Sequence, residues 1–316
     1  MKNLSFLILL LTASSFTSFG QHTNFNTQSN WALNKKEWML GFGGTQFTGD
    51  LGGRNQIGTD YSLVDIDWPS TSLGGMLGYR FRFHPYWATT TSLNIGMIRG
   101  NDAHTQEIIR ESRNLHFRSM IFEIQQRIEV IVLAHEKFGH RYGLAGHSKK
   151  MGNHNEQVYL FTGIGAAYFN PKAQYKGTWT ALRPLKTEGQ GLAGGPIQVL
   201  GVTATIPFGI GARMGIGRMW RLGIEATYVK TFSDYIDDVS GVYYDRDVLA
   251  VEMGEEAAYL SNPAQTNTTW FGTGQQRGDD QLDAYYYMNI FVARNVTYKD
   301  YARARRMHRW NGRYKF

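Results

Sequence analysis

Apolar and polar residues alternate along segments of about ten residues, and this alternation limits the fold more than any other feature of the sequence. It is clearest in Ser119–Val132, where Met120, Phe122 and Ile124 begin an apolar face that only Gln126 interrupts. The residues between them are mostly polar or charged. Because successive side chains of a β-strand point to opposite sides, this period of two predicts a strand with one apolar and one polar face.

The same division recurs along the rest of the chain. The further segments that share it are Trp38–Thr48, Leu73–Phe83, Trp87–Ile98, Val158–Phe169, Thr205–Ile216, Trp220–Val229 and Tyr285–Ala293. A secreted β-sandwich is the alternative, because its strands alternate as well. The repeated pairing of an apolar face with a face of glycine and charge is typical of a membrane barrel. We therefore predict an all-β fold, an eight-stranded antiparallel transmembrane β-barrel with long outer loops.

The polar faces of these segments combine glycine with long charged side chains of both signs. The predicted inward charges are Arg80, Arg82, Glu123, Arg127, Glu129, Arg213, Arg221 and Glu225. An eight-stranded barrel is barely wide enough inside for side chains, so inward glycines leave room for long ones. Buried charges have to be paired. We therefore expect these residues to form a charge network in the lumen, whereas in a sandwich they would face water.

The N-terminal twenty residues resemble a secretory signal peptide. A lysine at position 2 precedes the apolar run Leu4–Leu11, and Ser18-Phe19-Gly20 offers small residues before Gln21. The apolar run is too short to cross a bilayer as a helix. The chain has no cysteine, which excludes a lipid-modified N-terminal cysteine, disulfides and thiolate zinc sites. We expect a signal peptide at 1–20, a barrel in the cell outer membrane at 21–298, and a tail at 299–316.

The lengths of the connections predict the orientation of the barrel. The connections at 83–86 and 217–219 are short, and those at 50–71, 99–114, 170–203 and 230–283 are long. Outer-membrane barrels have short periplasmic turns and longer outer loops, so the long connections are predicted to lie outside the cell. The connection at 134–156 departs from this rule, because it would be periplasmic and yet is long and basic. Its histidines, His135, His140, His147 and His154, could bind a metal, but their spacing matches no compact ligand pattern, and a solvated loop is the simpler interpretation.

The tail at 299–316 carries much of the positive charge of the chain. Its basic residues are Lys299, Arg303, Arg305, Arg306, Arg309, Arg313 and Lys315, against one acid, Asp300. On the periplasmic side such a tail could bind an acidic protein, anionic lipid heads or peptidoglycan. A disordered solubilising tail is the alternative. Nucleic acid is not expected in this compartment. The candidate partner-binding residues are Arg303, Arg305, Arg306, Arg309 and Arg313.

An aspartate-rich string is the main candidate for chemistry. Asp234, Asp237 and Asp238 are followed by Asp245 and Asp247. Paired carboxylates can hold calcium or act in acid–base catalysis. The spacing is not that of an EF-hand loop, and a packed loop with capped turns is the default. We predict no catalytic residue, no resident metal, no cofactor and no small-molecule substrate.

Several strings, taken together and in this order, resemble the PorG-like outer-membrane barrels of the type IX secretion system. They are Phe47-Thr48-Gly49-Asp50-Leu51, Arg113-Asn114-Leu115-His116-Phe117-Arg118-Ser119, the string from Leu182 to Gly191, Ile206-Pro207-Phe208-Gly209-Ile210-Gly211, the string from Asp234 to Asp245, and Gln276-Arg277-Gly278. The resemblance covers nearly the whole chain after the signal peptide.

The resemblance implies a transport role without catalysis. PorG-like barrels are thought to anchor to the outer membrane a periplasmic ring, built from a lipoprotein and its partner, that serves secretion and gliding motility. The long connection at 134–156 and the basic tail depart from the family pattern, and they are the sizeable periplasmic parts. A stand-alone barrel acting as adhesin or membrane anchor is the alternative, and a lipid-active barrel enzyme is a third. A pore is disfavoured, since eight strands leave no aqueous channel.

Overall fold

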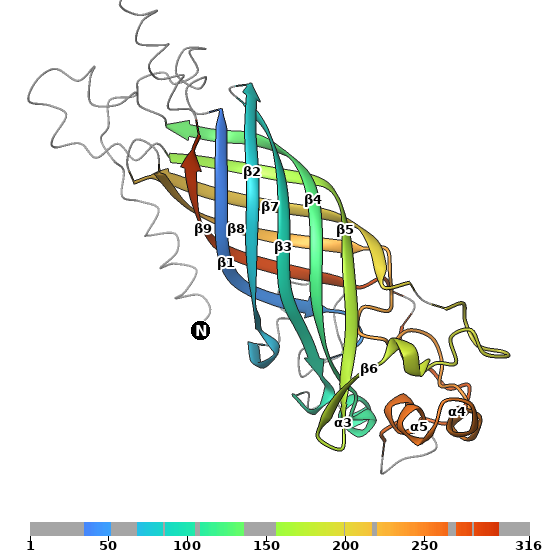
Figure 1. Cartoon of the computed structure of the whole chain (residues 1–316). Helices are drawn as coiled ribbons and strands as arrows, with labels where there is room; N and C mark the ends of the chain where they lie inside the picture. The colour runs from blue at the N-terminus through green and yellow to red at the C-terminus, as the bar shows by residue number, and fades with distance from the viewer. Residues whose placement is uncertain are drawn as a thin grey trace, which may run out of the picture.

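The computed structural model describes residues 35–51, 68–84, 86–104, 108–135, 156–198, 200–216, 220–264, 270–279 and 281–296. In this part of the chain eight antiparallel strands pair in a closed ring, which is shown in Figure 1. They are β1 (Lys36–Thr48), β2 (Ser72–His84), β3 (Trp87–Asn101), β4 (His116–His135), β5 (Glu156–Tyr175), β7 (Val202–Gly215), β8 (Trp220–Thr231) and β9 (Ala284–Asn295). Each predicted segment lies in one of these strands to within one residue, so the predicted fold class is confirmed.

The ring closes because β1 pairs with both β2 and β9, and β4 pairs with both β3 and β5. Closure removes the free sheet edges that would otherwise expose unpaired backbone groups to lipid. Among the described residues, no helix has the length and apolar character needed to cross a bilayer.

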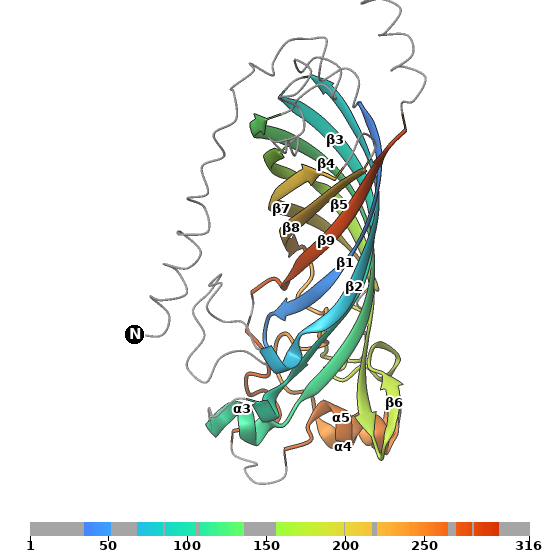
Figure 2. The ribbon, with the colours of Figure 1, turned by 90° about the vertical axis from the view of Figure 1, so that its left-hand side faces the viewer.

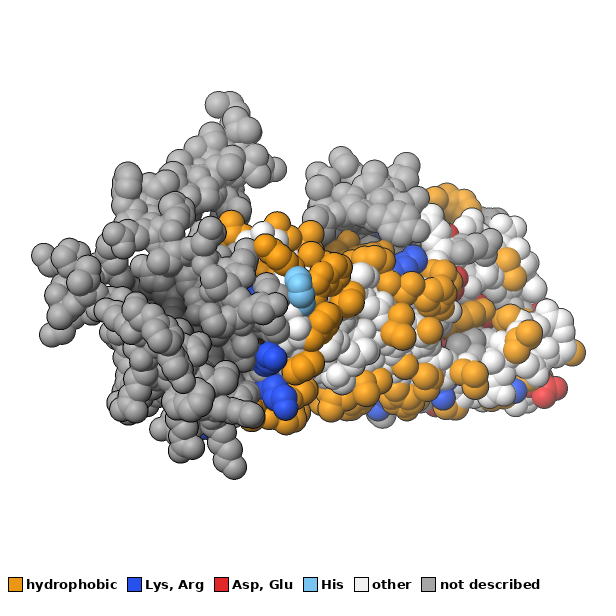
Figure 3. All heavy atoms as spheres, turned by 90° about the horizontal axis from the view of Figure 1, so that it is seen from above, with side chains coloured by type: hydrophobic (Ala, Val, Ile, Leu, Met, Phe, Trp, Pro, Cys, Tyr) orange, Lys and Arg blue, Asp and Glu red, His pale blue; other side chains and the backbone are white. Residues whose placement is uncertain are grey.

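The outer wall of the barrel is apolar on strand after strand. In β4, Phe122 and Ile124 are 47% and 52% exposed, whereas Glu123 between them is 2% exposed. Leu40 and Met288, on β1 and β9, are exposed to 67% and 69%. Figure 3 shows hydrophobic side chains spread over the face of the described body. A continuous apolar wall of this kind fits lipid rather than water, so the chain is a transmembrane barrel.

The two ends of the barrel differ (Figure 2). The end with the short turns also holds the start of β1 and the end of β9. The opposite end carries short elements in the long connections: β6 (Thr178–Ala181), α3 (Ile108–Arg113), α4 (Arg246–Glu252) and α5 (Glu255–Ser261), with the 3-10 turns η2 (Trp68–Ser70), η3 (Asp102–His104) and η4 (Arg183–Leu185). By the loop-length rule this is the outer end. We call the described residues of these four long connections the outer cap.

The interior of the molecule has an apolar level and a charged level. Towards the outer end, Ile98, Ile121 and Tyr285 of the wall cluster with Ile236 and Leu260 of the outer cap. Towards the short-turn end, the interior is lined mainly by charged side chains and by smaller groups of aromatic and methionine side chains. The outer cap therefore shares one hydrophobic core with the outer half of the barrel.

Inward glycines make room mainly for aromatic rings, which differs in part from the expectation that they accommodate charged side chains. A Cβ at Gly211 would lie 2.3 Å from the ring of Tyr159, and one at Gly209 would lie 2.2 Å from the ring of Phe161. Gly223 is placed in the same way against Phe291. In each case a bulky ring fills the space left by the glycine that it opposes on the neighbouring strand, which is how a narrow barrel reaches close packing.

Candidate functional site

The charged level of the lumen is organised around one glutamate of β1. Glu37 is buried and lies 2.6 Å from Nη1 of Arg213, 3.1 Å from Nε of Arg221 and 3.5 Å from Nη1 of Arg80. The strand predicted from the alternation begins at Trp38, so Glu37 is not among the predicted lumen charges. The two-residue period, extended by one position, would have placed it on the inner face.

Further pairs continue this network across the lumen. Arg80 donates to Glu129 at 2.5 Å, and Arg127 lies 3.1 Å from the carboxylate of Glu225. The hydroxyl of Tyr159, which was not predicted as a network member, donates to Glu225 at 2.5 Å.

Glu123, nearer the outer end than these pairs, accepts a hydrogen bond from Thr205 at 2.7 Å. Arg82 is buried in the wall of β2. The structure therefore places all eight predicted lumen charges inside the barrel, each at most 5% exposed. Six of the eight form ion pairs with one another or with Glu37, so the lumen is a filled core rather than a channel.

The outer cap contains a second buried network, whose first centre is Arg113 at the end of α3. Its guanidinium donates to both carboxylate oxygens of Asp102, at 2.7 and 3.0 Å. It also donates to the backbone carbonyls of Arg277 and Asp50, at 2.7 Å each. Although burial alone would lower it, the pKa of Arg113 is raised by Asp102. One side chain thus joins three of the outer connections.

Arg277 is the second centre of this network. It donates to Glu188 at 2.7 Å, to the carbonyl of Asp238 at 2.6 Å and to the carbonyl of Ser261 at 3.2 Å. Glu188 is 2% exposed and also accepts from the backbone N–H of Ser240 at 2.9 Å. Glu188 is therefore a packed member of the outer cap, which the sequence alone did not establish.

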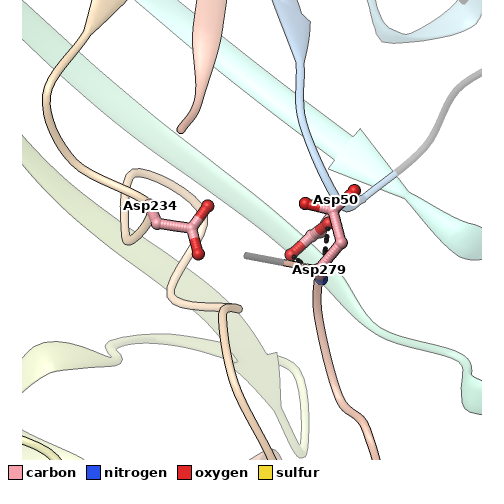
Figure 4. A group of neighbouring side chains, drawn as sticks. All are labelled: Asp50, Asp234 and Asp279. Carbon is pink, nitrogen blue, oxygen red and sulfur yellow. Dashed lines mark hydrogen bonds between the residues drawn. The ribbon is translucent and has the colours of Figure 1, made fainter. Parts of the chain in front are cut away.

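Aspartates gather where the outer cap meets the rim of the barrel. Asp50, Asp234 and Asp279 each offer a carboxylate oxygen, and these oxygens all lie within 4.8 Å of one another (Figure 4). The backbone N–H of Asp279 donates to both oxygens of Asp50, at 3.1 and 3.0 Å. Burial and the neighbouring carboxylate of Asp279 raise the pKa of Asp50 to about 8.

Two further aspartates lie beside this group and are fully enclosed. Asp237 and Asp283 are at most 1% exposed, and burial raises the pKa of each well above its ordinary value. Oδ1 of Asp237 accepts from the N–H of Val239 at 3.0 Å, and Asp283 accepts from the N–H of Ile236 at 2.9 Å. Of the predicted aspartate string, Asp234 and Asp237 thus join the rim group. Asp238 instead faces Thr187, which donates to it at 2.5 Å.

The other candidate residues have different outcomes. Asp245 caps α4 by accepting from the N–H groups of Asp247 and Val248, so it serves a turn. The tail arginines Arg303, Arg305, Arg306, Arg309 and Arg313 lie outside the described residues. The same holds for the predicted signal peptide at 1–20 and for most of the histidine-rich connection, of which His140, His147 and His154 fall in the part not described.

The strings that carry the family resemblance come together in space. Asp50, Arg113, Glu188, Asp238 and Arg277 come from five of them, and all belong to the cap network described above. The hydrogen bonds among these five residues join positions that are 39 to 164 residues apart in the sequence. The strings therefore encode the contacts that hold the outer connections to one another.

No protein-family model matches the chain, and no curated protein sequence matches it. Among solved structures, it is similar to Ail, the attachment invasion locus protein of Yersinia pestis, at 9% identity and a TM-score of 0.35, covering 83% of this chain and 98% of that chain. Neisserial surface protein A is similar at 4% identity and a TM-score of 0.34, with 83% and 97% covered. OprG from Pseudomonas aeruginosa is similar at 10% identity and a TM-score of 0.33, with 82% and 96% covered. The closed ring and its apolar wall identify the chain as an outer-membrane β-barrel.

Proposed function

We propose that this barrel anchors the periplasmic ring of the type IX secretion and gliding machinery to the outer membrane, without catalysis. The observation that carries the proposal is the filled lumen, in which Arg80, Arg82 and Glu129 are at most 1% exposed. A barrel with a packed interior offers a secreted protein no path, so its contribution to secretion has to come from contacts with other components. The family resemblance names the components, a ring lipoprotein and its partner.

The periplasmic end is the end proposed to make these contacts. The strands β4, β5 and β9 each have one end there, and these ends are the points at which the sequence continues into 136–155 and into the tail after Val296. Both segments are basic in sequence. An acidic surface on the ring lipoprotein would complement the tail arginines, and such complementarity speeds association and fixes orientation.

The test is a pull-down of the tagged full chain from gently solubilised outer membranes. The tail variant combines Arg303→Glu, Arg305→Glu and Arg306→Glu. The control variant, Lys176→Glu with Arg246→Glu, alters exposed bases of the outer cap instead. We expect the ring lipoprotein to be recovered with the wild type and with the control variant. With the tail variant, the amount of ring lipoprotein recovered is expected to fall about tenfold or more. If the pull-down recovers only lipopolysaccharide, and a strain that lacks the gene secretes normally, the proposal is ruled out.

A stand-alone adhesin is the second candidate, because the outer cap exposes large apolar side chains. Ile197 is 90% exposed, Val251 85% and Ile108 69%. Exposed apolar groups on an ordered surface are common where proteins bind partners. If the chain is an adhesin, Val251→Asp and Ile108→Asp reduce binding of cells to a host surface, and secretion is unaffected. Under the anchor proposal the same substitutions leave ring recovery unchanged.

A further inference from the structure

Three carboxylates from separate parts of the sequence meet at the rim between barrel and outer cap. Asp50 follows the end of β1, Asp234 follows β8, and Asp279 precedes β9. Figure 4 shows Asp234 pointing from one side towards the pair formed by Asp50 and Asp279. Like charges at this separation repel one another, and a cation among the three oxygens would offset that repulsion.

The spacing of the oxygens suits one calcium ion. Calcium binds oxygen ligands at about 2.3–2.6 Å, so two ligands on opposite sides of the ion are about 4.6–5.2 Å apart. The oxygens of Asp50, Asp234 and Asp279 fall within 4.8 Å of one another. Water and further carbonyl or carboxylate oxygens usually complete a coordination number of six to eight.

An independent observation is the buried carboxylate of Asp237. The residue is 0% exposed, and its Oδ2 accepts no hydrogen bond from the described residues. Its strongest electrostatic neighbours are other carboxylates, those of Asp283, Asp50 and Asp234. A fully buried carboxylate oxygen without a donor is costly, and a cation held by the neighbouring aspartates would offset that cost.

Arg113 lies beside Asp50 but forms its ion pair with another carboxylate. Arg113 contacts Asp50 through the backbone carbonyl of that residue, while its guanidinium is paired with Asp102. The backbone is also shaped around the carboxylates: a Cβ at Gly278 would lie 2.2 Å from Oδ2 of Asp50, and one at Gly49 would lie 2.3 Å from Oδ1 of Asp283. Glycine at these two positions lets the chain approach the carboxylates closely.

We propose that Asp50, Asp234 and Asp279 bind a calcium ion, with Asp237 as the buried acid behind them. The ion would join the end of β1 to the beginning and the end of the β8–β9 connection. It faces the extracellular side, where sites with dissociation constants of about 0.1–1 mM are common. Calcium binding would therefore hold the outer cap closed on the barrel outside the cell and release it when calcium is removed.

Calorimetry with the full chain, refolded in detergent and stripped with chelator, tests the site directly. Calcium chloride is expected to bind with a dissociation constant of about 0.1–1 mM, and magnesium chloride at least about tenfold more weakly. Asp234→Asn and Asp279→Asn are expected to weaken calcium binding at least about tenfold. Asp247→Asn is the matched control, because it removes an exposed aspartate of α4 and is expected to bind like the wild type.

Hydrogen exchange of residues 232–283 separates a calcium ligand from a residue that only supports the fold. In chelator, Asp279→Asn relieves repulsion and is expected to make the outer cap at least as protected as in the wild type. With 2 mM calcium the order of protection reverses, because the wild type gains about threefold to twentyfold and Asp279→Asn gains at most about threefold. Folding of every barrel is checked by its heat-dependent shift on electrophoresis. The proposal would be overturned if the wild type did not bind calcium, or if Asp247→Asn weakened calcium binding as much as Asp234→Asn and Asp279→Asn do.

Discussion

At the scale of single residues, the outer cap depends on two buried arginines that bond to backbone carbonyls as well as to carboxylates. Arg113 and Arg277 between them reach four carbonyl oxygens, on Asp50, Arg277, Asp238 and Ser261. A guanidinium has five donors in a rigid plane, so it can satisfy several carbonyls at once that would otherwise be buried without partners. This explains how the long outer connections can pack closely against one another.

Arg277→Met is expected to open the outer cap while leaving the barrel closed. The substitution keeps most of the apolar stem but leaves Glu188 as a buried, unpaired charge, with an expected cost of about 3–5 kcal/mol. Hydrogen exchange of residues 182–191 and 234–240 measures how much protection the outer cap loses. Arg246→Met, which changes an exposed arginine of α4, is the control and should change stability by no more than about 0.5 kcal/mol. Equal protection in both variants would contradict the role assigned to Arg277.

Protection of the outer cap is expected to depend on pH when calcium is chelated. Burial raises the pKa of Asp238 from 3.8 to about 7, against the opposing effect of Arg277. A pKa that is higher in the folded state than in the unfolded state favours the protonated, folded form. Its contribution is complete below about pH 4 and is lost as the pH rises through 7. The raised pKa of Asp50, about 8, acts in the same direction.

The measurement is the protection factor of residues 232–264 at pH 5.5 and at pH 8.5. Higher protection is expected at pH 5.5. Asp238→Asn, which stays neutral throughout, should reduce the difference between the two values. A protection factor that is higher at pH 8.5 would contradict the assigned direction.

At the scale of elements, β1 is the strand that closes the ring and also supplies the acid at the centre of the lumen network. It pairs with β2 on one side and β9 on the other, and Glu37 reaches arginines of β2, β7 and β8. The network therefore ties the closing strand to the far wall of the barrel as well as to its neighbours. Ladder hydrogen bonds alone connect only adjacent strands.

Glu37→Gln is expected to destabilise the whole barrel. The amide is similar in shape but leaves Arg80, Arg213 and Arg221 without a shared counter-charge, at an expected cost of about 3–5 kcal/mol. Urea unfolding in lipid vesicles measures the free energy. Glu111→Gln, in the exposed part of α3, removes the same charge outside the barrel and should have little effect. Equal unfolding midpoints for the two variants would show that the lumen network does not stabilise the barrel.

At the scale of the whole molecule, the barrel is closed to solutes at two levels. The charged lumen is packed by side chains such as Arg80 and Tyr159, and the apolar cluster that includes Ile121 and Ile236 lies between the lumen and the outer side. The described part of the chain is therefore a filled barrel with a packed outer cap.

Vesicles that contain the purified chain should not become permeable to small sugars. Liposome swelling in arabinose is expected to match that of empty vesicles and to be far slower than with a general porin. The Arg277→Met variant should remain impermeable as well, because the lumen below the cap is still filled. Swelling at the rate of a porin would disprove the filled lumen and, with it, the observation on which the anchor proposal rests.

The fold class, the strands and their inner and outer faces can all be predicted from the amino-acid sequence. The reason is physical: lipid on one side and a narrow lumen on the other impose a period of two on every strand, and that period is visible in segments such as Ser119–Val132. The same period placed all eight predicted charges in the lumen. The signal peptide, the tail and the ring partners stay predictions.

The packing of the long connections could not be predicted from the sequence and is seen only in the three-dimensional fold. Their contacts join residues as far apart as Arg113 and Arg277, and no local period marks such pairs. Asp50 and Asp279 are separated by most of the chain, so their meeting with Asp234 follows from ring closure, which brings the end of β1 beside the start of β9. A closed barrel gathers the ends of all its strands at two rims, and the rim groups are therefore a property of the ring rather than of any one segment.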